Sequence, residues 1–239
     1  MLLRLPTSVS EAQECMAEGA VPIGGATLVW ANWQRDGFPE HAMSLRDLPE
    51  ANAIGRETLG AAVVLNRIDD RVPQALRQAA ATVGTGAVRR TASVGGNIVG
   101  STLRDLLPAA LVLDARAVVL EPDSVYETDL AEVLAKSPLL LSLRWRAPIA
   151  SGYRKLAGEA GDPPPLVAAA LHTADGGGTR LRVAVRDGYE VLSESTECTA
   201  DSEQALDDLR RTAIGALHST AWEVVRQQVT DLVPRPADG

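Results

Sequence analysis

The chain has 239 residues, 46% hydrophobic residues and a formal net charge of −8. This length is sufficient for a substantial core, in one large domain or in two to three small ones. The acidic balance argues against a nucleic-acid partner, because contact with phosphates along a duplex needs clustered Lys and Arg.

The cysteine spacing and the hydropathy argue against further classes of protein, namely metal-cluster, membrane and secreted proteins. Cys15 and Cys198 are far apart and no Cys-x-x-Cys pair occurs, so the chain has no iron–sulfur or zinc signature of its own. No apolar stretch approaches the ~20 residues needed to cross a bilayer. Met1–Pro6 also lacks the zones of a signal peptide. We therefore expect a soluble, cytoplasmic protein with no membrane partner.

Residues 1–55 predict a small α/β subdomain. Ser8 and Glu11 form a capping box, and Gly19 ends the helix that follows. The apolar face of this helix is expected to carry Ala12, Cys15 and Met16. The next elements are a strand over Ala20–Ile23, a helix over Thr27–Trp33 and a strand over His41–Leu45. This alternation predicts that the strands are parallel neighbours.

Residues 56–148 predict a second α/β subdomain around a glycine-rich stretch, Gly84–Gly100. In the first of its helices, Leu76, Ala79, Ala80 and Val83 are spaced to face a core. The expected strands cover Thr58–Val64, Ala115–Leu120 and Leu139–Trp145, and the expected helices cover Val72–Val83, Asp105–Leu113 and Leu130–Ala135.

Residues 149–239 predict a sheet-plus-helix subdomain. A hairpin turn at Asp175–Gly178 joins two expected strands, and Asp187-Gly188 marks the next turn. The strands cover Leu166–Thr173 and Leu181–Val185, and the helical stretches cover Ser202–Leu217 and Thr220–Leu232.

Two glycine pairs are the candidate binding loops. In Ile23-Gly24-Gly25-Ala26-Thr27, a strand runs into two glycines and then a helix start, where free N–H groups suit a phosphate. In Ser93-Val94-Gly95-Gly96-Asn97, hydroxyl and amide side chains flank a second pair. Each loop taken singly is equally compatible with a tight structural turn. Together they provide for the two phosphates of a dinucleotide, while the Gly-x-Gly-x-x-Gly pattern of NAD-binding folds is absent.

These loops and their flanks resemble the flavin-binding subunits of molybdenum hydroxylases, the family of the carbon monoxide dehydrogenase medium subunit and the xanthine dehydrogenase flavin domain. The second loop is followed, as in that family, by Asp105-Leu106-Leu107-Pro108. Further similar segments are Leu5-Pro6-Thr7-Ser8, Pro39-Glu40-His41, Gly60-Ala61 and Tyr153-Arg154-Lys155-Leu156. The resemblance covers most of the chain.

The resemblance implies an α+β fold of the vanillyl-alcohol-oxidase-like type. Two α/β subdomains, 1–55 and 56–148, would bind FAD between them, and 149–239 would form an antiparallel sheet with helices. The backbones of Ile23 to Thr27 and of Ser93 to Asn97 would hold the pyrophosphate region of FAD.

Four further residues are implied to contact the cofactor. Asp105 would accept hydrogen bonds from the sugar hydroxyls of FAD. Lys155 would lie near the flavin, where a positive charge favours the reduced anion, and Leu140 would pack on the ring. Thr102 belongs to the same cofactor-binding set, in a stretch between Asn97 and Asp105 that is about one residue shorter than the family pattern.

Other polar and aromatic residues are interpreted as structural. His41, His172 and His218 are scattered, so no metal site is expected. The tryptophans Trp30, Trp33, Trp145 and Trp222 are expected to be packing residues rather than a stacking platform. No Ser-His-Asp or Cys-His set has support in the sequence, so no residue is assigned a catalytic role.

The function implied by the resemblance is electron relay by an FAD-binding oxidoreductase subunit. Its partners would be a molybdenum-cofactor large subunit and a 2Fe-2S small subunit. The short C-terminal region leaves open a free-standing flavoenzyme without molybdenum. The altered Gly100–Arg104 stretch leaves open a degenerate scaffold subunit that has lost FAD.

Overall fold

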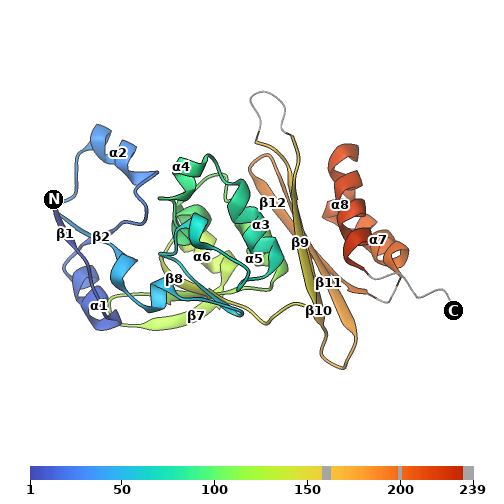
Figure 1. The fold of residues 1–239 in the computed structure, drawn as a ribbon, viewed down its shortest axis with the longest axis horizontal. Helices are drawn as coiled ribbons and strands as arrows, with labels where there is room; N and C mark the ends of the chain where they lie inside the picture. The colour runs from blue at the N-terminus through green and yellow to red at the C-terminus, as the bar shows by residue number, and fades with distance from the viewer. Residues whose placement is uncertain (158–162, 199–200, 234–239) are drawn as a thin grey trace. The chain divides into compact units, whose positions relative to one another are not determined.

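The computed structural model describes residues 1–157, 163–198 and 201–233 (Figure 1). The chain divides into two compact units, each assembled from separate segments. The first unit comprises Met1–Val72, Val83–Arg104 and Ala115–Trp145, and the second comprises Pro73–Thr82, Asp105–Asp114 and Arg146–Gly239.

The first unit begins with a small parallel sheet. Its strand order is β1-β3-β2, and both pairings with β3 are parallel, which confirms the prediction of parallel neighbours. Helix α1 has Ser8 as its N-cap, and it buries Ala12 and Cys15 as expected. The elements are β1 (Leu2–Arg4), α1 (Val9–Ala17), β2 (Val21–Pro22), α2 (Val29–Asp36) and β3 (His41–Met43).

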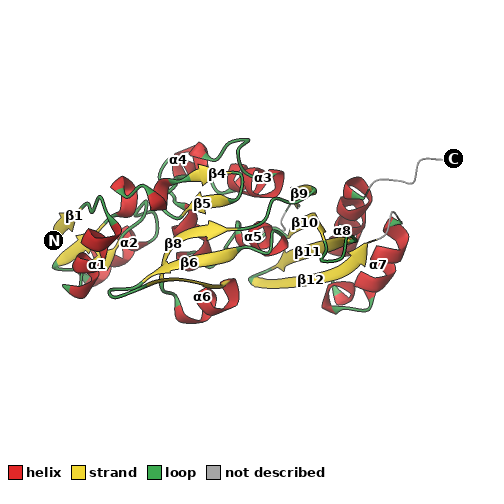
Figure 2. Ribbon diagram, turned by 90° about the horizontal axis from the view of Figure 1, so that it is seen from below, coloured by secondary structure: helices red, strands yellow, loops and turns green. Residues whose placement is uncertain are grey.

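The second sheet of the first unit has five antiparallel strands in the order β4-β5-β8-β6-β7. Strands β5, β8 and β6 lie side by side in Figure 2. The elements are β4 (Ile54–Gly55), β5 (Thr58–Gly60), α4 (Gly86–Arg89), β6 (Arg116–Leu120), β7 (Val125–Asp129), α6 (Leu130–Lys136) and β8 (Leu139–Arg144). The strand expected over Thr58–Val64 ends early, at Gly60. A Cβ on Gly60 would lie 2.2 Å from the Ala51 carbonyl oxygen, so the chain passes too close to that backbone to carry a side chain.

The second unit is a four-stranded antiparallel sheet in the order β12-β11-β10-β9. Helices α7 and α8 lie on one side of this sheet and α3 and α5 on the other (Figure 1). The antiparallel C-terminal sheet and the turns at Asp175 and Gly188 confirm the prediction. The elements are α3 (Gln74–Thr82), α5 (Leu107–Val112), β9 (Ala150–Lys155), β10 (Leu166–Thr173), β11 (Thr179–Asp187), β12 (Glu190–Cys198), α7 (Ser202–Arg210) and α8 (Ser219–Leu232).

Strand β10 explains why α3 and α5 belong to this unit. Its residues Leu166–Leu171 are all buried, because helices cover both faces of the sheet. Two of the covering helices come from the expected second subdomain, so the unit extends beyond 149–239 by Pro73–Thr82 and Asp105–Asp114. The division into three subdomains stays a prediction. None of the helices among the described residues is long and apolar enough to cross a membrane.

One buried histidine makes the stability of the second unit depend on pH. His172 Nε2 on β10 donates to the Val112 carbonyl at the end of α5, at 2.7 Å. Burial lowers the pKa of His172 from 6.5, the Val112 hydrogen bond opposes this shift, and Arg182 adds to the lowering. Below about pH 6.5 the unfolded chain therefore binds a proton that the folded chain does not, and stability falls as the pH falls.

The replacement His172→Gln tests this dependence. Urea unfolding at about pH 7.5 and about pH 5.5 is expected to show a larger loss of unfolding free energy for the natural chain than for the variant. The glutamine keeps an N–H donor but has no titrating group. Equal losses in the two proteins would show that His172 is not the titrating group.

Candidate functional site

The two glycine loops lie against each other in the first unit. The first loop leaves β2, where the Ile23 N–H donates to the Met43 carbonyl at 2.8 Å. A Cβ on Gly24 would lie 2.5 Å from Ser93 Oγ, and one on Gly25 would lie 1.5 Å from the Thr91 carbonyl oxygen. Neither glycine has a positive φ. Both are therefore required by the close approach of the second loop, and not by backbone conformation.

The first loop presents free hydrogen-bond donors. Within the described part of the chain, no acceptor is found for the backbone N–H groups of Gly24, Gly25, Ala26 and Thr27. Ala26 also has a φ of 58°, in the left-handed region that non-glycine residues seldom adopt. Consecutive N–H groups at such a turn, before the start of α2, form a typical anion-binding arrangement.

The second loop differs, because most of its N–H groups serve the fold. Val94 donates to the Val63 carbonyl at 3.0 Å and Gly95 to the Ala61 carbonyl at 2.9 Å. Gly96 donates to Ser93 Oγ at 3.2 Å and Asn97 to the Ser93 carbonyl at 3.0 Å. The residues Gly96–Gly100 form a π-helical turn, which the sequence did not predict. The second loop therefore supports the first, and its hydroxyl at Ser93 faces Gly24.

Both loops line one cavity of about 620 Å³ in the first unit. This volume is within the range of small-molecule and cofactor sites, about 300–1,000 Å³. Of the residues predicted from the sequence, the cavity wall includes Ile23, Gly24, Gly25, Ala26, Thr27, Ser93, Gly95, Gly96 and Leu140. Val94 and Asn97 are buried beneath the second loop, and Thr102 is exposed.

Sequence reasoning missed other parts of the cavity wall, which include Leu28, Val29, Asn32, Arg46 and Leu139. Leu28, Val29 and Asn32 follow the first loop closely in the sequence, so their position next to the binding loop could have predicted that they line the cavity. Arg46 and Leu139 carry no such signal, since only the packing of β3 and β8 brings them to the cavity.

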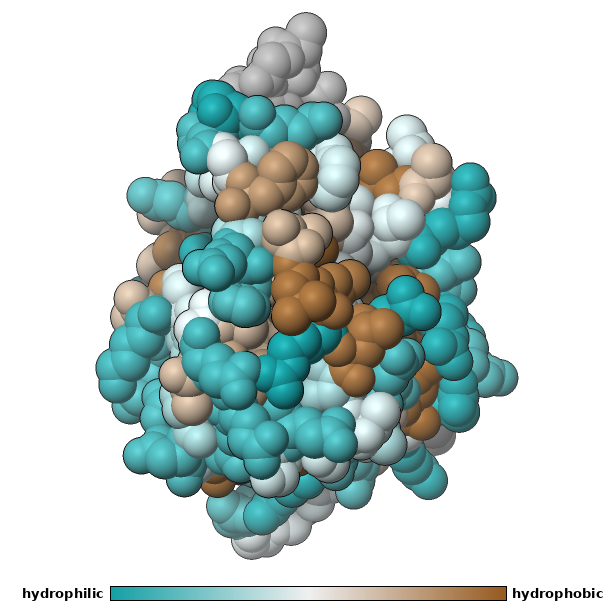
Figure 3. All heavy atoms as spheres, turned by 90° about the vertical axis from the view of Figure 1, so that its left-hand side faces the viewer, coloured by the Kyte–Doolittle hydropathy of each residue, from teal (hydrophilic) through white to brown (hydrophobic). Residues whose placement is uncertain are grey.

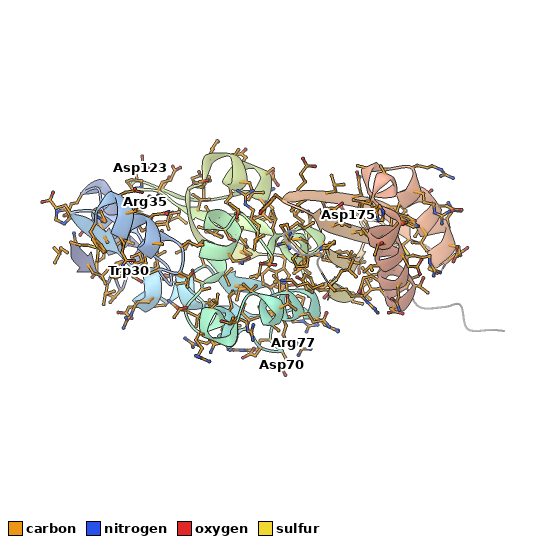
Figure 4. The ribbon with its side chains drawn as sticks, turned by 90° about the horizontal axis from the view of Figure 1, so that it is seen from above. Trp30, Arg35, Asp70, Arg77, Asp123 and Asp175 are labelled. Atoms are coloured by element: carbon orange, nitrogen blue, oxygen red, sulfur yellow. The ribbon has the colours of Figure 1, made fainter. Side chains whose placement is uncertain are left out.

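Helix α2 covers part of this cavity but buries none of its own residues. Trp30 is 47% exposed and contacts Phe38 edge-on, with ring centroids 5.2 Å apart. Figure 4 labels Trp30 together with Arg35 of the same helix. The expectation that all four tryptophans are packing residues is wrong for Trp30, because α2 has no buried residue in the described part of the chain. Trp145, in contrast, is buried and donates to the Arg56 carbonyl at 2.9 Å.

Apolar side chains are also exposed elsewhere in the first unit. They gather near the centre of the face in Figure 3, among polar residues. The large exposed apolar residues of this unit include Leu2, Leu3, Val21, Leu28, Trp30 and Phe38.

The two charged candidates, Asp105 and Lys155, meet in the second unit. Lys155 Nζ lies 3.2 Å from Asp105 Oδ1 and also donates to the Thr82 carbonyl at 3.2 Å. Arg186, which the sequence reasoning did not single out, donates to the same Asp105 oxygen at 3.1 Å. Asp105 lies just before α5 and Arg186 lies near the end of β11, so the sheet and its covering helix bring them together.

The residues of the first unit fit a cofactor that carries phosphates and flat rings. The glycines leave room where a Cβ would collide with the second loop, the N–H groups have no acceptor among the described residues, and apolar side chains such as Leu28 and Leu140 line the wall. No group of three or more His, Cys, Asp or Glu able to hold a metal ion is found among the described residues.

Comparison with known proteins agrees with this geometry. Residues 3–142, more than half of the chain, match the family described as the FAD binding domain in molybdopterin dehydrogenase. No curated protein gave a significant match over any part of the chain.

Two solved structures share the fold. One is a Cu,Mo-CO dehydrogenase in its cyanide-inactivated form, at 20% identity and a TM-score of 0.75, covering 95% of this chain and 96% of that chain. The other is the reconstituted CO dehydrogenase from Oligotropha carboxidovorans, at 21% identity and a TM-score of 0.67, covering 99% and 88%. These matches confirm the predicted mixed fold with its antiparallel sheet.

Proposed function

This chain belongs to the family of FAD-binding domains in molybdopterin dehydrogenases, and on that premise we propose that it is the electron-relay subunit of a larger oxidoreductase. Bound FAD supplies the redox chemistry, taking electrons from one partner and passing them to an acceptor. The partners in this proposal are a molybdenum-cofactor large subunit and a 2Fe-2S small subunit. The chain itself binds and orients the cofactor, and no side chain is needed as an acid or base.

One observation carries the proposal: four consecutive N–H groups, from Gly24 to Thr27, have no acceptor in the described chain and line the cavity. Gly25 and Ala26 are half-buried, whereas Gly24 and Thr27 are exposed. Consecutive backbone N–H groups at such a turn suit a ligand that accepts hydrogen bonds. We assign this loop the pyrophosphate of FAD. The hydroxyl of Ser93 is a further donor on the facing loop.

The remaining site residues receive roles of three kinds. The Gly95 N–H donates to the Ala61 carbonyl and the Gly96 N–H to Ser93 Oγ, so both stabilise the second loop, and Val94 and Asn97 are buried beneath it. Leu140 provides an apolar wall for a ring. Asp105, Lys155 and Thr102 keep the cofactor contacts that the family resemblance implies, with Asp105 as acceptor of a sugar hydroxyl.

The proposal is tested on the purified full-length chain. Titration with FAD, followed by quenching of flavin fluorescence, is expected to show saturable binding, and flavin absorption is expected to persist through gel filtration. Co-purification from the native cell with a molybdenum subunit and an iron–sulfur subunit would support the relay role. A chain that takes up no FAD contradicts the proposal. A chain that binds FAD but has no such partners points instead to a free-standing flavoenzyme.

Amide hydrogen exchange in α2 is expected to report cofactor binding. A helix of eight residues with no buried side chain is marginal by itself, so its amides exchange quickly in the free chain. FAD in the cavity covers Leu28, Val29 and Asn32, and we expect exchange over Val29–Asp36 to slow by about tenfold or more. The amides of α8, in the other unit, are the internal control. FAD binding with unchanged exchange in α2 would place the cofactor elsewhere.

A further inference from the structure

One charged side chain lines the cavity of the first unit. Within the described part of the chain, Arg46 is the only charged residue on the cavity wall, and the other lining residues are apolar residues, glycines or uncharged polar residues. The chain as a whole has a net charge of −8, so a positive charge at this place is not an average property of its surface. An arginine on the wall suits an anionic group of a ligand.

The position of Arg46 follows from the small parallel sheet. Strands β2 and β3 are paired in register, with Pro22 opposite Met43. The first glycine loop begins after Pro22, and the short 3-10 helix Leu45–Asp47 begins just after Met43. Both segments therefore leave the sheet at the same edge. In α/β sheets, ligands bind at the carboxyl ends of parallel strands, where the loops from neighbouring strands can contact the same molecule.

The backbone that carries Arg46 is held by one amide side chain. Asn52 Nδ2 lies within hydrogen-bond reach of the carbonyl oxygens of Leu45, Arg46 and Leu48, at 2.9, 2.9 and 2.8 Å. Leu45 and Leu48 are also buried, so the segment is anchored in the core. The base of the Arg46 side chain therefore has a defined place on the wall, which reduces the conformational entropy lost when a ligand binds.

The guanidinium of Arg46 keeps donors for a ligand. Its Nε lies 3.5 Å from Oδ1 of the neighbouring Asp47, in a loose ion pair between side chains that are 69% and 44% exposed. No hydrogen bond of this guanidinium occurs among the described residues. A guanidinium has five N–H donors in a fixed fork that matches phosphate oxygens. Because the Asp47 contact is loose and exposed, a phosphate can bind without breaking a strong ion pair.

We propose that Arg46 is the cationic contact of the cofactor's diphosphate. The proposal rests on the proposed FAD binding and deepens it, because it names the side chain that adds a full charge to the hydrogen bonds of the first loop. The N–H groups from Gly24 to Thr27 are donors that carry only partial charges. The loop and Arg46 act on the same anion, because their segments leave adjacent strands at one edge and line one cavity.

The test compares Arg46→Gln with Arg35→Gln in the full-length chain, with the dissociation constant of FAD as the readout. Arg35 is the matched control, because it is 71% exposed, pairs with the following residue, Asp36, at 2.8 Å, and is not on the cavity wall. Both replacements remove one positive charge. Arg46→Gln is expected to weaken FAD binding by about fivefold, the scale of one exposed ion pair. Arg35→Gln is expected to weaken it by less than about twofold.

The dependence of FAD binding on salt is the second readout. Added NaCl is expected to weaken FAD binding to the natural chain more than to Arg46→Gln, because salt screens the attraction between Arg46 and the phosphates. Arg46→Lys keeps the charge, so it is expected to keep this salt dependence and to lose less affinity. Circular dichroism on each variant separates binding from folding.

Two results would overturn the Arg46 contact while leaving FAD binding in place. The first is an unchanged FAD affinity in Arg46→Gln. The second is an equal loss in Arg46→Gln and Arg35→Gln, which would show a general effect of charge on the surface. A natural chain that binds no FAD overturns the proposed function instead, so the two failures are distinguishable.

Discussion

Replacement of Gly25 by alanine is expected to abolish tight FAD binding and to destabilise the first unit. A Cβ at this position would lie 1.5 Å from the Thr91 carbonyl oxygen and 2.3 Å from its carbon, both of them backbone atoms that cannot turn aside. The two loops must therefore separate, which moves the free N–H groups from Gly24 to Thr27. We expect FAD affinity to fall by about a hundredfold or more and the free energy of unfolding to fall by about 1–3 kcal/mol.

Alanine replacements at two further glycines serve as comparisons for Gly25→Ala. Gly24→Ala meets only the Ser93 hydroxyl at 2.5 Å, a side-chain atom that is able to rotate away, so a smaller loss is expected. Gly86→Ala, in the first turn of α4, meets nothing closer than 3.7 Å and is expected to leave binding and stability unchanged. Isothermal titration and urea unfolding on the three variants measure both effects. The losses of FAD affinity and of unfolding free energy are expected to be largest for Gly25→Ala, smaller for Gly24→Ala and absent for Gly86→Ala. A different order would show that the loops do not pack as described.

Removal of the Asp105 carboxylate is expected to cost more stability than loss of any exposed ion pair in the second unit. Asp105→Ala takes away the acceptor shared by Lys155 and Arg186, and the Arg186 side chain is only 1% exposed. Breaking a buried ion pair from one side costs about 3–5 kcal/mol, because the remaining charge stays away from water. Chemical unfolding followed by circular dichroism measures this loss.

The matched control for Asp105→Ala is Asp231→Ala. Asp231 pairs with Arg154 on the surface of the same unit, where the two side chains are 53% and 39% exposed. Exposed pairs contribute little, so a change within about 1 kcal/mol is expected. Similar losses for the two variants would mean that the Asp105 cluster is solvated and is not a buried network.

These stability values also bear on how FAD binding by Asp105 variants is interpreted. Because Asp105 has a structural role as well as a proposed cofactor contact, a loss of FAD affinity in Asp105→Ala has two sources. Asp105→Asn keeps the shape of the side chain and one oxygen acceptor. It is therefore the more informative variant for the cofactor contact, provided that its unfolding free energy is measured alongside.

Elements with strong local signals were predictable from the sequence. The capping residues Ser8 and Glu11 and the stop at Gly19 defined α1. The Asp-Gly turns marked the β10–β11 hairpin and the turn after β11, although the strand β12 itself was not predicted. Strands β1 and β7 were missed, because β1 is short and mainly exposed and β7 buries only Thr128. Neither strand shows the apolar alternation on which strand prediction depends.

The candidate site was predictable in part. Both glycine loops and Leu140 reach one cavity, as expected for a shared site. From the sequence, both loops were predicted to bind phosphate through their backbone N–H groups. In the structure, the first loop has free N–H groups, whereas most N–H groups of the second are already bonded within the fold. Only hydrogen-bond partners distant in sequence, Ala61 and Val63, reveal that the second loop uses its donors within the fold.

The sequence by itself indicated the family, through short motifs and their order in the chain, and the match of residues 3–142 confirmed it. Glycine pairs and the acid at Asp105 are local features, because backbone freedom and charge belong to single residues. The tertiary structure decided which helices cover the C-terminal sheet, which loop has free N–H groups, and that Arg186 holds Asp105. These properties depend on contacts between residues far apart in the chain, and packing, not local propensity, sets them.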